Sequence, residues 1–132
     1  SNMMFYKNKI ALIDSQDAVL GNPAYDLASL IDDVRIKTSN SFKSNILKVF
    51  LSKFKYKNES QFINDFEILS VLRNLKIIGI FTRLANRDKK KKYLKLIPYA
   101  WKLIDNRMKN NSNFNDLINF LKENPKIKKN EN

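Results

Sequence analysis

The chain has 132 residues, of which 43% are hydrophobic and 11% aromatic, so its composition is that of a folded protein with one modest core. It contains no cysteine and no histidine, which excludes disulfides, Cys/His metal sites, thiol nucleophiles and every His-based catalytic triad. The 25 Lys and Arg residues against 13 Asp and Glu give a formal net charge of +12.

This positive charge suits anionic partners in general, but it is spread along the chain and is not gathered in one stripe. We therefore do not expect nucleic acid as a partner. No apolar run is long enough to span a bilayer and the start lacks a signal-peptide pattern, so we expect no membrane partner and a cytoplasmic location.

The first predicted element is a β-hairpin within residues 1–14. Two short apolar runs, Met3 to Tyr6 and Ile10 to Ile13, flank the polar turn Lys7-Asn8-Lys9. A single hairpin is marginally stable in water, so we expect it to pack on the helices that follow.

A bundle of about five helices is predicted over residues 23–125, followed by a tail at 126–132, and the whole chain is predicted to be one domain. Pro23 suits the first turn of the first helix. The apolar face of this helix is predicted from the helical spacing of Leu27, Leu30, Ile31 and Val34. The next helix begins within residues 38–41, which offer caps, and its predicted apolar face consists of Phe42, Ile46, Val49, Phe50 and Phe54.

The third predicted helix is the longest, from a cap at Ser60 to about Asn86. Its segment 77–81 is apolar on nearly every side, which predicts a central position in the domain. Gly79 within this segment predicts the close approach of another backbone. Pro98 either kinks the fourth helix or starts a new one, and Pro125 ends the last.

Carboxylates gather near the start of this basic chain, where a predicted strand meets a helix. Asp14 follows an apolar run, and its carboxylate is the type of oxygen ligand that Mg²⁺ prefers. An aspartate at this place could equally serve to form the turn that follows. Asp26 lies in the first turn of a helix, where a carboxylate favours the positive end of the helix dipole. Asp32 and Asp33 are most simply read as a solvated helix face or as partners of Arg35.

Two segments carry a resemblance. "LIDSQDAVLGNPAYDLASLIDDVR" (residues 12–35) resembles the segment that follows the catalytic loop in the aminoglycoside phosphotransferase and choline-kinase-like superfamily. "LRNLKIIGIFTRLANRDKKKKYLKLIPYAWKLID" (residues 72–105) is similar to the tail of bacterial N-acetylmuramate/N-acetylglucosamine anomeric sugar kinases of cell-wall recycling. The resemblance implies a mainly α fold, namely the helical C-terminal lobe of a protein-kinase-like fold with a short N-terminal β-hairpin.

The resemblance also implies roles for single residues. Asp14 would match the aspartate that holds Mg²⁺ against the phosphates of ATP, and Asp26 would match the aspartate that supports the catalytic loop. Arg73, Asn74 and Arg83 lie on the long helix of the lobe that forms the acceptor pocket in such enzymes. They are therefore candidates for contacts with an amino-sugar substrate, with surface or salt-bridging roles as the alternative.

The sequence departs from the superfamily in two ways. Ser15 stands where the superfamily has an aromatic residue beneath the metal-binding aspartate, so the support of Asp14 differs. Without histidine there is no His-x-Asp loop, and two glycines make no phosphate-covering loop. We therefore expect no catalytic residue in this chain, which looks like the truncated C-terminal part of a kinase and would be inactive alone.

The sequence also predicts an alternative function and a tendency to self-associate. The alternative to a working kinase is a degenerate kinase remnant that acts as a binding or scaffold module. In either case the hairpin and the first helix would present an uncovered apolar face, which predicts self-association through the hairpin side.

Overall fold

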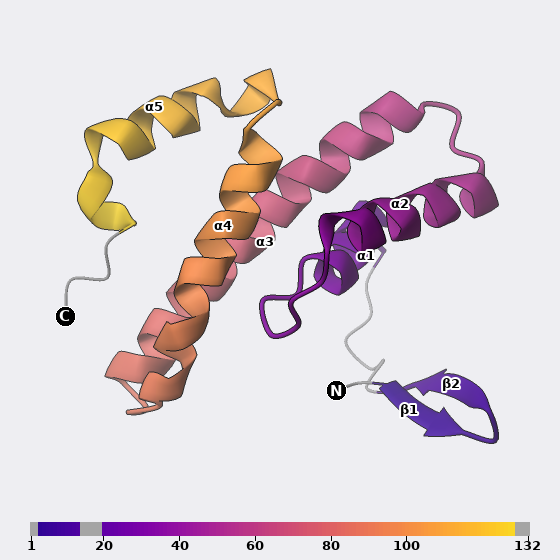
Figure 1. Cartoon of the computed structure of the whole chain (residues 1–132), viewed down its shortest axis with the longest axis horizontal. Helices are drawn as coiled ribbons and strands as arrows, with labels where there is room; N and C mark the ends of the chain where they lie inside the picture. Colours follow the sequence, from indigo (N-terminus) through magenta and orange to yellow (C-terminus); the bar gives the residue numbers. More distant parts are fainter. Residues whose placement is uncertain (1–2, 14–19, 129–132) are drawn as a thin grey trace.

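The computed structural model of the chain describes residues 3–13 and 20–128. The predicted metal-binding Asp14 and its neighbours at 15–17 lie outside the described residues. The elements in chain order are β1 (Met3–Tyr6), β2 (Lys9–Leu12), α1 (Ala24–Ile31), α2 (Asn40–Phe54), α3 (Glu59–Asn86), η1 (Lys91–Leu96), α4 (Ile97–Met108), η2 (Ser112–Phe114), α5 (Asn115–Glu123) and η3 (Pro125–Ile127). The predicted fold class, mainly helical with a short N-terminal hairpin, is confirmed (Figure 1).

The hairpin forms as predicted but does not pack on the helices. β1 and β2 pair antiparallel with Tyr6 opposite Lys9, and the two turn residues between them, Lys7 and Asn8, have positive φ angles of 47° and 59°. This backbone is typical of a tight two-residue hairpin turn. Figure 1 shows the hairpin apart from the helices, and Phe5 and Ile10 are 75% and 69% exposed. The expected packing is wrong because the helices bury their apolar faces against one another, in two clusters that contain no hairpin residue.

Helix α1 lies close against the N-terminal half of α3. Its start is held by Asn22, whose Oδ1 accepts a hydrogen bond from the backbone N–H of Ala24 at 3.0 Å. Ala24 and Ala28 are fully buried, and such small side chains permit a close approach between helices. Leu30, expected on the buried face, is 57% exposed, because the buried face is shifted toward the two alanines.

Helix α2 begins where the sequence predicted. The Oγ of Ser39 accepts a hydrogen bond from the backbone N–H of Phe42 at 3.2 Å, which satisfies one donor of the first turn. The predicted apolar face is only partly covered, since Phe42, Val49 and Phe54 are each more than half exposed. They border an apolar groove of about 470 Å³ between α1 and α2.

Helix α3 is the central element, as its apolar composition predicted. It packs against α1 through its N-terminal half, where Phe62 and Phe66 are buried, and against η1 and α4 through its C-terminal half. Its cap is Asn58 and not Ser60, because the Oδ1 of Asn58 accepts from the backbone N–H of Gln61 at 2.9 Å. Gly79 faces open space, with no atom within 4 Å of an added Cβ, so the predicted close backbone approach is wrong.

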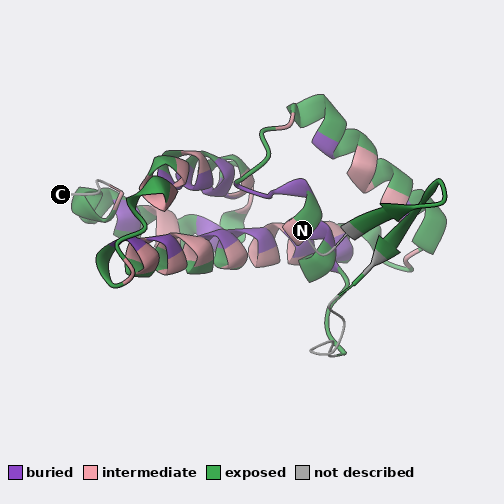
Figure 2. Cartoon of the chain, turned by 90° about the horizontal axis from the view of Figure 1, so that it is seen from below, coloured by how far each residue is buried: buried purple, intermediate pink, exposed green. Residues whose placement is uncertain are grey.

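Helix α4 starts anew beside Pro98, which confirms one of the two predicted outcomes at that proline. The 3-10 turn η1 precedes it, and the missing N–H of Pro98 falls in the first turn, where no partner is needed. Buried residues line the facing sides of α3 and α4 in Figure 2. Helix α5 ends at Glu123, before Pro125, as predicted.

Within residues 3–13 and 20–128, no helix combines the length and the apolar character needed to cross a membrane.

Candidate functional site

The most unusual side chain of the described structure is Asp32, a carboxylate with no solvent exposure at the C-terminal end of α1. The residue continues the row that Ala24 and Ala28 form along the helix, one turn apart each, so its side chain points into the protein. The interpretation of Asp32 as part of a solvated face is therefore wrong. The spacing 24, 28, 32 was the sequence signal that could have revealed its burial.

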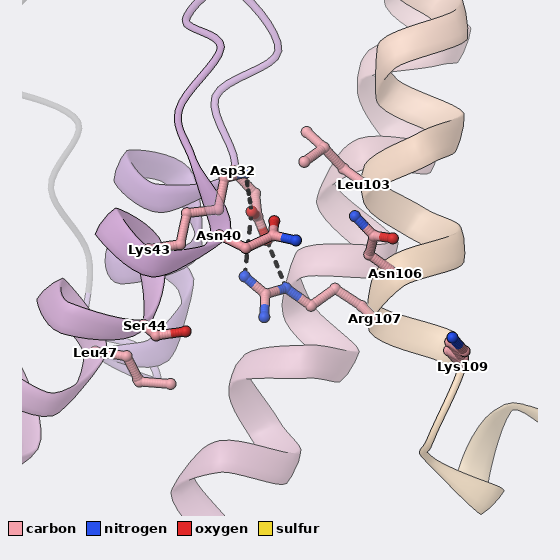
Figure 3. Close-up of a pocket in the computed structure, with 9 residues that line it drawn as sticks. All are labelled: Asp32, Asn40, Lys43, Ser44, Leu47, Leu103, Asn106, Arg107 and Lys109. Atoms are coloured by element: carbon pink, nitrogen blue, oxygen red, sulfur yellow. Dashed lines mark hydrogen bonds and ion pairs between the residues drawn. The ribbon is translucent and has the colours of Figure 1, made fainter.

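Asp32 holds together four segments of the chain. Its Oδ1 accepts from Lys43 Nζ of α2 at 2.8 Å, and its Oδ2 accepts from Ser70 Oγ of α3 at 2.6 Å. Arg107 of α4 donates through Nε to Oδ2 at 2.8 Å and through Nη2 to Oδ1 at 3.2 Å (Figure 3). Each carboxylate oxygen thus accepts two hydrogen bonds, which is the full capacity of an aspartate.

The electrostatics of this cluster keep Asp32 ionised. Burial alone raises the pKa of Asp32, but the hydrogen bonds and charge of Arg107, together with the hydrogen bonds from Lys43 and Ser70, outweigh burial and hold this pKa below its ordinary value. A carboxylate at a helix C-terminus also faces the negative end of the helix dipole. Lys43 and Arg107 are therefore needed to offset the free-energy cost of a buried carboxylate at this helix end.

Asp33 forms a separate pair with Arg35, which confirms the expected partnership. The Nε of Arg35 donates to Asp33 Oδ1 at 2.9 Å, and the backbone N–H of Arg35 donates to the same oxygen at 2.8 Å. The hydrogen bond from the Arg35 side chain lowers the pKa of Asp33, and partial burial opposes this shift without cancelling it.

A polar cavity of about 330 Å³ opens beside the Asp32 cluster, between α2 and α4. Two kinds of polar side chain line it besides Asp32: the cations Lys43, Arg107 and Lys109, and the neutral groups Asn40, Ser44 and Asn106. Figure 3 shows Asn40 and Ser44 of α2 facing Asn106 and Arg107 of α4 across a common space. Leu47 and Leu103 complete the lining. A cavity of this size and polarity can hold a small polar molecule.

Asp26 lies in the first turn of α1 and is exposed. No residue that the structure describes bonds its side chain, so the predicted support of a catalytic loop stays a prediction. The start of the same helix is tied to α3 by Asn22, whose Nδ2 donates to Asp65 Oδ2 at 2.8 Å.

The three candidate substrate contacts on α3 do not form one site. Arg73 is half-buried near Asp33, and its Nη1 donates to the backbone oxygen of Asp32 at 3.4 Å. Burial lowers the pKa of Arg73. Asn74 is fully buried and its Nδ2 donates to the backbone oxygen of Ser70 at 3.0 Å. Arg83 is exposed, ten residues or about 15 Å along the helix from Arg73. Their substrate roles stay predictions.

A metal site is not formed by the described residues, among which no three Asp, Glu, His or Cys side chains gather. The predicted Mg²⁺ ligand Asp14 lies outside them, so the structure offers no geometry for it.

The chain is similar in sequence to known phosphotransferases. Residues 1–59 match the phosphotransferase enzyme family. The chain is 34% identical over 97 residues to the N-acetylmuramate/N-acetylglucosamine kinase of Caulobacter vibrioides, which covers 74% of this chain and 27% of that protein. It is 34% identical over 103 residues to the protein of the same name from Neisseria meningitidis, with 74% of this chain and 31% of that protein covered.

A third relative, the N-acetylmuramate/N-acetylglucosamine kinase of Pseudomonas aeruginosa, is 26% identical over 110 residues, or 79% of this chain and 32% of that protein. These matches confirm the predicted resemblance to phosphotransferases and to amino-sugar kinases. The chain spans about 30% of the length of the curated relatives that it matches.

Proposed function

We propose that this chain, whose residues 1–59 match the phosphotransferase enzyme family, supplies the C-terminal helical part of an ATP-dependent amino-sugar kinase. The observation that carries the proposal is the 34% identity, over 74% of this chain, to two N-acetylmuramate/N-acetylglucosamine kinases. The acceptor would be a hydroxyl of N-acetylmuramate or N-acetylglucosamine, as in cell-wall recycling.

In this proposal Asp14 binds Mg²⁺, and Asp26 supports the catalytic loop of the complete enzyme. A magnesium ion, when bound, offsets the negative charge of the ATP phosphates during transfer. The carboxylate of Asp14 is the type of ligand that Mg²⁺ prefers. Asp26 is exposed on α1 and no residue within 3–13 or 20–128 bonds its carboxylate, which is consistent with a contact to a loop backbone.

A chimera tests this function directly. The part of the Caulobacter vibrioides kinase that matches this chain is replaced by the chain itself, and phosphorylation of N-acetylglucosamine by ATP is measured. We expect activity in the chimera and a loss of at least about a hundredfold on Asp14→Ala, because a metal ion supplies several kcal/mol of transition-state stabilisation. Asp105→Ala, an exposed carboxylate on α4, is the matched control and should leave the rate unchanged.

The chain on its own should not phosphorylate a sugar. It has no histidine for a His-x-Asp loop, and neither of its two glycines lies in a phosphate-binding loop motif. The same assay on the purified chain checks this, and turnover above the no-enzyme background would contradict it.

The second candidate function is a binding or scaffold module, and the uncovered apolar surface favours it. Phe5 and Ile10 on the hairpin and Leu30 on α1 are each more than half exposed. Exposed apolar surface of this kind tends to find a partner. We also propose that two copies of the chain associate through the side of the molecule that carries the hairpin. A folded but inactive chimera together with such association would favour the module over the kinase.

A further inference from the structure

We propose that the polar cavity between α2 and α4 binds a small oxyanion, a phosphate or a carboxylate group, on Lys43 and Arg107. The inference stands apart from the proposed kinase function, because it requires neither ATP nor an amino sugar. It rests on the charge of the cavity, on the donors that Asp32 leaves open, and on the neutral polar groups around them.

The first observation is the charge balance of the lining. Lys43, Arg107 and Lys109 are cations and Asp32 is the one carboxylate among the residues that line the cavity, which gives the lining a formal charge of +2. The acceptor sites of Asp32 are already occupied, since its two oxygens accept four hydrogen bonds from Lys43, Ser70 and Arg107. An aspartate has no further acceptor sites to offer.

The second observation is that the cations keep open donors. An ammonium group has three donors and a guanidinium has five. In the portion of the chain that the structure describes, Lys43 uses one of them and Arg107 uses two, all toward Asp32. Figure 3 shows the remaining guanidinium nitrogen of Arg107 directed away from Asp32.

Burial makes these open donors significant. The side chain of Lys43 is only 7% exposed and that of Arg107 only 20%, so bulk water hydrates them poorly. Water molecules in the cavity can accept from them but carry no charge. An oxyanion supplies both the acceptor oxygens and the missing negative charge, and hydrogen bonds between charged groups are about twice as strong as neutral ones.

The third observation is that the cavity is already built. The orientation of the Arg107 side chain is fixed by Asp32 and by the ring of Phe66, whose centroid lies 4.7 Å from the guanidinium carbon. Asn106 of α4 and Asn40, at the start of α2, line the same space and make no side-chain hydrogen bond to any residue within 3–13 or 20–128. Their amide groups are available to a ligand.

The test is a titration of the whole chain with sodium phosphate, and separately with sodium acetate, at constant ionic strength. Binding is followed in ¹H–¹⁵N NMR spectra through the side-chain amide signals of Asn40 and Asn106. We expect saturable shifts of these signals with at least one of the two anions, and the anion that binds more tightly identifies the preferred group. N-acetylglucosamine serves as the neutral probe.

Matched variants locate the site. Asn106→Asp places a negative charge in the cavity without changing the size of the side chain, and it should weaken anion binding by about tenfold or more. Asn119→Asp makes the same change on an exposed position of α5 and should weaken it less than about twofold, since solvent screens distant charges. If Asn106→Asp does not fold, Lys109→Gln removes one cation of the lining and should weaken binding about threefold.

Three results would overturn the proposal. The first is the absence of saturable binding by either anion. The second is an equal loss of affinity in Asn106→Asp and Asn119→Asp, which would mean a general response to net charge. The third is binding of N-acetylglucosamine at the Asn40 and Asn106 signals with no binding of the anions.

Discussion

At the scale of single residues, Asp32 connects more helices through hydrogen bonds than any other side chain in the described structure. It joins α1 to Lys43 of α2, Ser70 of α3 and Arg107 of α4, and it has no contact with solvent. A buried ion pair is weak evidence for stability by itself, because desolvation offsets the attraction. Removal of one partner is different, since it leaves the other charges buried and unpaired.

Asp32→Asn should therefore lower the free energy of unfolding by about 3–5 kcal/mol. Urea denaturation followed by circular dichroism measures this change. The matched control is Asp105→Asn, because Asp105 is exposed and pairs with Lys128 on the surface, and it should change the free energy by less than about 1 kcal/mol. Similar losses in both variants would mean that burial of Asp32 has no special role.

The ionisation of Asp32 predicts how stability depends on pH. The pKa of Asp32 is lowered in the folded chain, so its contribution to stability is present above the unfolded pKa of about 3.9 and is lost as the pH falls through the folded pKa. We expect the free energy of unfolding to fall below about pH 4. A ¹³C NMR titration of the Asp32 carboxyl carbon checks the assignment, and a midpoint at or above 3.9 would contradict it.

At the scale of elements, the contact between α3 and α4 carries the main core. Ile104 of α4 is fully buried in it, together with Ile97, Trp101 and Val71. Ile104→Ala should lower the free energy of unfolding by about 2–5 kcal/mol, because it leaves a cavity in a packed interior. Leu72→Ala on α3 is the control, since Leu72 is 56% exposed, and it should stay within about 0.5 kcal/mol.

Helix α2 is joined to the rest of the molecule more sparsely than the other long helices. Its buried side chains are Lys43, which reaches Asp32, and Leu51, which packs in the cluster of α1 and α3. Its other apolar side chains border the exposed groove with α1, except Leu47, which lines the polar cavity. The position of α2 relative to α4, and with it the shape of the polar cavity, thus depends on the Asp32 cluster.

At the scale of the whole molecule, the hairpin stands apart from a helical body that is complete in its own core (Figure 1). Phe5 and Ile10 are the most exposed large apolar side chains of the described hairpin, so contact with another apolar surface would remove much apolar area from water. This separation is the basis for the proposed self-association through the hairpin side.

Phe5→Ser should weaken self-association of the chain about tenfold, since truncation of a well-packed anchor residue near the centre of an interface costs more than about 1 kcal/mol. Phe120→Ser is the matched control, because Phe120 is 51% exposed on α5, far along the chain from the hairpin. Sedimentation velocity over a range of concentrations measures the association. A wild-type chain that stays monomeric at high concentration would refute the proposal.

Local patterns in the sequence determined the hairpin and the five α-helices of this protein, but not its three 3-10 turns within the described residues. The spacing of apolar residues predicted the helices, and residues 38–41 and Pro98 marked two helix starts. The predicted turn Lys7-Asn8-Lys9 contains the observed turn, although Lys9 already belongs to β2. The motif at residues 12–35 also predicted the family match, because it lies within the matched residues 1–59. All of these features depend on residues close to one another in the chain.

The tertiary structure alone decided which polar residues are buried together and which apolar faces stay open. From the sequence, Asp32 was expected on a solvated face or beside Arg35, because its real partners lie 11, 38 and 75 residues away. For the same reason the hairpin was expected to pack on helices that already cover one another. A residue's burial depends on the free energy of contacts between distant segments, and a local pattern does not contain that information.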